Sequence, residues 1–177
     1  MLEVEALTLN SKGSSIITEL TSHKINKLIG HFPFILHDQH GEKINVITKV
    51  KPLDEEVILM VNSMAAMCNP RLAQAFNTFR HQLDFKGCHI RELGVMSQQD
   101  PRFTRHAPKV YGVLADPERE AYVIIEEHLK NVELMDSADD TFNWNREHIE
   151  AAIRGIAEVH SIWYGREEEL KQQPWLV

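Results

Sequence analysis

Residues 43–52 read KINVITKVKP, and this stretch decides the fold that we predict. Its side chains alternate in character and many are β-branched, which is typical of a strand. Pro52 ends the strand, because proline has no backbone N–H to donate to a neighbouring strand. Lys49 and Lys51 lie two positions apart, so their side chains point to the same face of the strand. The sequence therefore predicts a strand that presents two lysines side by side.

The segments after this strand predict three helices, a β-hairpin, an acidic linker and one long helix. The helices show apolar residues at a spacing of three and four positions, and the hairpin shows β-rich runs on either side of a turn. We expect helices beginning near Asp54, Pro70 and Cys88, a hairpin over 110–126 and a last helix after Asn145. The expected side-chain caps of the first, second and last of these helices are Asp54, Asn69 and Asn145. The expected architecture is an α+β fold with an antiparallel sheet of roughly five strands and helices packed on one side.

Composition limits the class of protein. The chain has 177 residues and a net charge of −7, which argues against a general nucleic-acid or anionic-membrane surface. It contains no apolar run long enough to span a bilayer, and residues 1–15 do not read as a secretory signal. Its two cysteines, Cys68 and Cys88, are too few for a disulfide framework. We expect a cytoplasmic protein without a nucleic-acid or membrane partner.

Four stretches occur in an order that matches a known pattern. They are VITKVKP at 46–52, RELGVM at 91–96, APKVYG at 107–112 and YVIIEEHL at 122–129. Together they resemble the small lobe of the aminoglycoside phosphotransferase and choline kinase-like family, which has a protein kinase-like fold. The stretch GIAEVH at 155–160 is similar to the helix that precedes the catalytic loop in that family.

The resemblance implies ATP with Mg²⁺ as the cofactor. In the family pattern a strand lysine holds the phosphates and a helix glutamate holds the lysine, which assigns these roles to Lys49 and Glu92. Lys51 is a rival to Lys49, because both lysines share one face of the strand. Glu55 and Glu56 are nearer in sequence than Glu92 and compete with it for the lysine.

The resemblance also implies where the adenine would bind. Its edge would meet backbone groups of Glu127, His128 and Leu129, with Ile125 at the back of the pocket. The catalytic loop and the metal-binding aspartate of the family would follow beyond Val177. We therefore expect no catalytic residue and no metal ligand in this chain.

The resulting domain prediction has three parts. Residues 1–15 form a flexible arm, residues 16–129 form the kinase-like small lobe, and residues 130–177 form a hinge, a linker and the first helix of an incomplete second lobe. The implied function is the nucleotide-binding part of an ATP-dependent small-molecule phosphotransferase that is not competent alone. The alternative is a non-catalytic kinase-like interaction module. The apolar stripe of the 145–164 helix is expected to pair with the small lobe, the second lobe or another copy of the chain.

Overall fold

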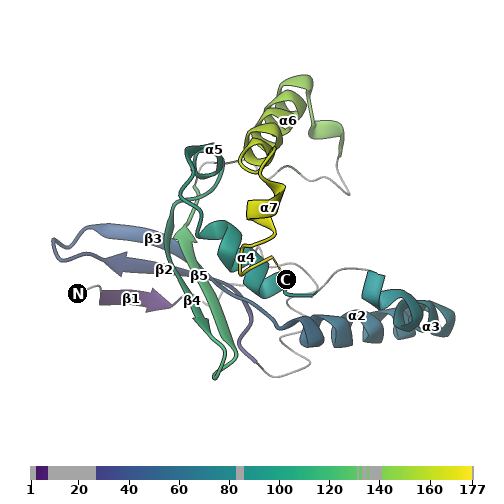
Figure 1. Ribbon diagram of the computed structural model, residues 1–177. Coiled ribbons are helices and arrows are strands. Elements are labelled where there is room, and N and C mark those ends of the chain that lie inside the picture. The colour runs from purple at the N-terminus through teal and green to yellow at the C-terminus, as the bar shows by residue number, and fades with distance from the viewer. Residues whose placement is uncertain are drawn as a thin grey trace.

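A computed structural model of the chain describes residues 3–7, 27–82, 86–130, 132, 135 and 141–176. These residues form an α+β fold with one sheet and several helices, as predicted (Figure 1). The described strands are β1 Glu3–Leu7, β2 Gly30–His37, β3 Lys43–Val50, β4 Val110–Asp116 and β5 Ala121–Glu127. The described helices are α2 Asp54–Cys68, α3 Pro70–Phe79, η1 Arg80–Gln82, α4 Cys88–Met96, α5 Pro101–Thr104, η2 Thr141–Asn143, α6 Arg146–Ser161 and α7 Glu167–Leu170.

The sheet has the strand order β1-β2-β3-β5-β4, and every neighbouring pair is antiparallel. This confirms the predicted antiparallel sheet. The lysine-bearing strand β3 lies in the middle of the sheet, where β2 pairs with one of its edges and β5 with the other. A central position fixes the register of β3 from both sides, so the directions of its side chains are strongly specified.

Strand β1 places residues 3–7 of the predicted N-terminal arm in the sheet. Glu3 pairs with His37 and Leu7 pairs with Phe34, so this segment forms an edge of the sheet. The pairing satisfies backbone groups that β2 would otherwise leave open at its edge. The alternating sequence EVEAL was the available signal, and residues 8–15 lie outside the described residues.

Helix α4 covers the sheet on one side and builds the core with β5. Leu93 of α4 packs with Tyr122 and Ile124 of β5, and Ile124 is completely buried. Burying side chains of this size contributes about 1.5–3 kcal/mol each. This packing holds α4 against the face of the sheet that carries Ile124.

Helices α2 and α3 pack against each other and extend away from the sheet (Figure 1). Asn69 caps α3 as predicted, because its side chain accepts a hydrogen bond of 2.8 Å from the backbone N of Arg71. The cap of α2 differs from the prediction. The Glu56 carboxylate, not Asp54, accepts from the backbone N of Leu53 at 2.7 Å, which leaves Asp54 for another contact.

Helix α6 begins after Asn145, whose side chain accepts a hydrogen bond of 2.9 Å from the backbone N of His148. The helix packs against α5. Its apolar stripe stays partly exposed, with Ile149 at 45%, Ile153 at 62% and Ile156 at 56%. Pairing of this stripe with a second lobe or a second copy stays a prediction. Within the described part of the chain, no helix combines the length and apolar character needed to cross a membrane.

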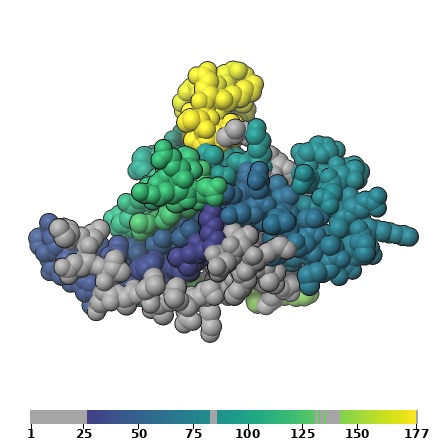
Figure 2. Space-filling model, turned by 90° about the horizontal axis from the view of Figure 1, so that it is seen from below, coloured from purple at the N-terminus to yellow at the C-terminus, as the bar shows by residue number. Residues whose placement is uncertain are grey.

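The C-terminal residues, yellow in Figure 2, form a projection on the surface of the molecule. Trp175 in this segment lies against Gly94 of α4, because a Cβ added to Gly94 would be 2.1 Å from Cγ of Trp175. Only glycine leaves room for the indole at this point of α4. The C-terminal segment is therefore docked on the same helix that covers the sheet.

Candidate functional site

The two predicted lysines lie at the interface between the sheet and α4. The register pairs Lys49 with Ile124 and Ile47 with Glu126. Directly opposed residues in an antiparallel pair share one face, so Lys49 and Glu126 lie on the face that carries Ile124. That face is the one against which Leu93 of α4 packs.

Four charged side chains meet there, and we call Lys49, Lys51, Glu92 and Glu126 the charge cluster. Nζ of Lys49 lies 2.9 Å from Oε1 of Glu126 and 4.0 Å from Oε1 of Glu92. Nζ of Lys51 donates a hydrogen bond to Oε2 of Glu92. The side chains of both lysines are 22% exposed. The structure therefore brings together the predicted Lys49, Lys51 and Glu92, and it gives the closer contact with Glu92 to Lys51.

Glu126 was not predicted as a site residue. Its side chain is only 6% exposed, and its Oε2 is buried with no hydrogen-bond partner among the described residues. In the structure Tyr122 and Ile124 are buried, and Glu126 continues their period of two on the same face of β5. A buried carboxylate is stable only with a compensating partner, and the ammonium of Lys49 provides it.

Asp54 fixes the start of α4. Its carboxylate accepts hydrogen bonds from the backbone N of Gly87 and, at 3.1 Å, from the backbone N of Cys88. His89 Nδ1 lies 3.0 Å from the same carboxylate, and the His89 ring meets the Tyr122 ring edge-on at 4.3 Å. A carboxylate at a helix N-terminus also interacts favourably with the helix dipole. These contacts fix the position of α4, the helix that carries Glu92 of the charge cluster.

Glu55 and Glu56, which were expected to compete with Glu92 for the strand lysine, lie elsewhere in the structure. Glu56 lies 3.0 Å from Nζ of Lys27, and its second oxygen accepts from the backbone N of Leu53. Glu55 lines an open pocket beside α2. The structure therefore assigns the strand lysines to Glu92 and Glu126 instead.

Two backbone amides of the predicted adenine-binding segment already donate hydrogen bonds within the chain. The backbone N of Glu127 donates to the carbonyl of Lys109 at 2.8 Å, and that of His128 donates to the carbonyl of Asn45 at 3.1 Å. The backbone ladder continues past the predicted end of the hairpin strand and uses these two donors itself. That backbone groups of this segment meet an adenine edge stays a prediction.

Ile125 and Leu129 lie away from the charge cluster or in solvent. Ile125 pairs with Thr48, and both neighbour residues that face α4, so their side chains point to the opposite face of the sheet. Leu129 is 45% exposed. The structure does not bring the side chain of Ile125 to the face that carries the lysines, and its place at the back of an adenine pocket stays a prediction.

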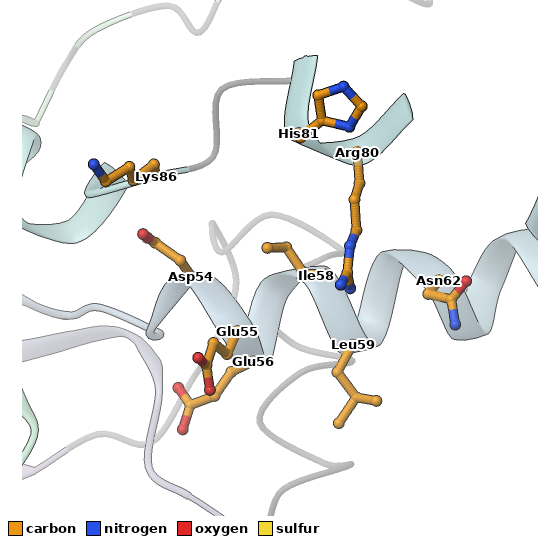
Figure 3. A pocket seen from close by; sticks show the side chains of 9 residues that line it. All are labelled: Asp54, Glu55, Glu56, Ile58, Leu59, Asn62, Arg80, His81 and Lys86. Atoms are coloured by element: carbon orange, nitrogen blue, oxygen red, sulfur yellow. The ribbon is translucent and has the colours of Figure 1, made fainter. Parts of the chain in front are cut away.

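An open pocket of about 870 Å³ lies beside α2 (Figure 3). Its described lining residues are Asp54, Glu55, Glu56, Ile58, Leu59, Asn62, Arg80, His81 and Lys86. In Figure 3 the side chain of Arg80 reaches from η1 toward α2. Acidic and basic groups both line this pocket, so it does not select a ligand of one charge. Sequence reasoning missed it, because its walls come from separate elements.

A second group of charges lies around α5, and we call the contacts of Arg105 and His106 with Glu158 of α6 the α5–α6 ion pairs. Arg102 holds the pKa of Asp100 down, from 3.8 to about 2, mainly through hydrogen bonds. A hydrogen bond from His106, whose Nε2 lies 2.9 Å from the carboxylate, lowers the pKa of Glu158. Nη1 of Arg105 lies 3.3 Å from the same carboxylate.

The charge cluster does not fit a magnesium ion. Glu92 and Glu126 both face lysine ammonium groups, which repel a cation. Within the described ranges no three His, Cys, Asp or Glu side chains gather in a way that could hold a metal.

Comparison with known proteins adds no family. No protein-family model, no curated protein and no solved structure matches this chain. A functional assignment therefore depends on the geometry of the charge cluster.

Proposed function

We propose that this chain is the nucleotide-binding part of an ATP-dependent small-molecule phosphotransferase with a kinase-like small lobe. The observation that supports it is the ion pair between Lys51 at the end of β3 and Glu92 on α4. In kinases a strand lysine held by a helix glutamate contacts the nucleotide phosphates. The contact favours Lys51 over Lys49 for this role.

The exposure of the lysines is consistent with a phosphate ligand. The side chains of Lys51 and Lys49 are each 22% exposed, so both lysines are mostly buried but remain in part accessible to solvent. An ammonium group binds phosphate as a compact point charge, and partial burial reduces screening by salt. Phosphoryl transfer depends largely on such positioning and charge stabilisation. No catalytic base and no metal ligand is assigned to the described residues.

The test is the binding of a non-hydrolysable ATP analogue, measured by titration calorimetry. We expect Lys51→Ala to weaken binding at least tenfold, about 1.4 kcal/mol, because it removes the lysine held by Glu92. Lys43→Ala is the matched control, since it removes the same charge from the other end of β3. Equal binding by the wild type and Lys51→Ala would contradict the proposal.

The alternative is a kinase-like interaction module that binds no nucleotide. The observation in its favour is the exposed apolar stripe of α6, formed by Ile149, Ile153 and Ile156. If this function is correct, the ATP analogue does not bind, and light scattering shows association that Ile153→Asp abolishes. Nucleotide binding by a monomer would exclude it.

A further inference from the structure

The charge cluster contains two unequal ion pairs. The Lys49–Glu126 pair is the deeper one, because the Glu126 side chain is 6% exposed and that of Glu92 is 34% exposed. Nζ of Lys49 lies 2.9 Å from Glu126 but 4.0 Å from Glu92. Lys49 therefore belongs to the buried carboxylate, and Lys51 is left with Glu92.

The buried carboxylate depends strongly on Lys49. Oε2 of Glu126 has no hydrogen-bond partner among the described residues, so Lys49 compensates the charge through Oε1 alone. A desolvated charge that loses its only partner is costly, so Glu126 retains the ammonium group firmly. Lys49 is therefore less able to bind an anion from solvent, because its ammonium group is paired with Glu126.

We propose that Glu126 competes with a bound polyphosphate for Lys49 and so limits the affinity of the charge cluster for anions. This inference rests on the proposed function in placing phosphate groups at the cluster. The two lysines and two glutamates sum to zero charge, so neutralising Glu126 leaves a net positive site. Glu126→Gln keeps the size of the side chain and an amide oxygen that accepts from Lys49, which preserves the lysine's position.

The experiment measures binding of inorganic tripolyphosphate by calorimetry at low ionic strength. We expect Glu126→Gln to bind about tenfold more tightly than the wild type, because it removes a negative charge adjacent to Lys49. Glu42→Gln is the matched control. It removes the same charge from an exposed residue in the turn just before β3, at the opposite end of that strand from Lys49. We expect the control to bind within about twofold of the wild type.

Three results would overturn the inference. They are unchanged or weaker binding by Glu126→Gln, an equal gain by Glu42→Gln, and no tripolyphosphate binding by any variant. If circular dichroism shows that Glu126→Gln is unfolded, Glu126→Leu replaces it, since leucine suits a buried position and also removes the charge. The same gain is expected from Glu126→Leu.

The inference and the proposed function fail separately. If Glu126→Gln gains tripolyphosphate affinity but the wild type does not bind the ATP analogue, the inference stands and the nucleotide assignment fails. If the wild type binds the ATP analogue through Lys51 but Glu126→Gln gains nothing, the assignment stands and Glu126 is no competitor.

Discussion

The charge cluster and the α5–α6 ion pairs both join two elements through opposite charges, but they differ in burial. In the cluster, the Glu126 side chain is 6% exposed. In the α5–α6 ion pairs, Arg105 is 55% exposed and Glu158 is 32% exposed. Solvent screens the second group and largely leaves the Lys49–Glu126 pair of the charge cluster unscreened. Similar contact distances therefore differ in energetic meaning. The buried Lys49–Glu126 pair is costly to break, whereas the exposed Arg105–Glu158 pair contributes little to stability.

The largest predicted effect comes from breaking the buried pair. Lys49→Met leaves Glu126 buried without a partner, which we expect to lower the free energy of unfolding by about 3–5 kcal/mol. Urea denaturation followed by circular dichroism measures this loss. The double variant Lys49→Met/Glu126→Leu should recover most of it, because an apolar pair replaces the uncompensated charge. A Lys49→Met variant as stable as the wild type would show that the pair is not buried in solution.

The second prediction compares how tightly α4 and α6 meet their neighbours. Gly94→Ala places a Cβ 2.1 Å from Cγ of Trp175, whereas Gly155→Ala places one 3.4 Å from Nδ1 of His106. We expect Gly94→Ala to destabilise the protein by about 1–3 kcal/mol through overpacking. Gly155→Ala, an ordinary contact, should be neutral or stabilising by up to about 1 kcal/mol through helix propensity.

Thermal unfolding with tryptophan fluorescence distinguishes the two glycine variants. Displacement of Trp175 by Gly94→Ala should shift the emission toward that of a hydrated indole, and Gly155→Ala should leave the emission unchanged. Equal stability of the two variants would mean that α4 does not meet its neighbour more closely than α6 does.

The smallest predicted effect is the pH response of the exposed pairs. Arg102 lowers the pKa of Asp100 from 3.8 to about 2. A lowered carboxyl pKa in the folded state stabilises the fold above the unfolded value, and the contribution is lost as the pH falls toward 2. The melting temperature of the wild type should therefore exceed that of Asp100→Asn at pH 7, and the gap should close near pH 2. A gap that is the same at both pH values would contradict the assigned cause.

The elements of the fold were largely predictable, because their signals are local. The alternation over 43–52 gave β3, and its period of two placed Lys49 and Lys51 on one face. Asn69 and Asn145 marked the starts of α3 and α6 through side-chain caps that the structure confirms. Each of these signals involves residues within a few positions of one another.

The pairings within the site were less predictable, because they depend on how distant elements pack. Whether Glu92 meets Lys49 or Lys51 is decided by the position of α4 along β3. That position depends on Asp54, whose role at the start of α4 has no local signature. Glu126 was overlooked because a charged residue in a strand suggests a solvent-facing position.

The central claim is that a nucleotide places its phosphates beside Lys51, and affinity labelling tests it most directly. An acyl-phosphate derivative of ATP transfers its acyl group to a lysine amine near the bound phosphates and releases ATP, and mass spectrometry identifies the modified residue. We predict acylation of Lys51 that excess ATP suppresses, with no ATP-dependent change at Lys43, which is exposed at the other end of β3. Labelling of Lys51 that ATP does not affect, or labelling confined to exposed lysines, would contradict the account.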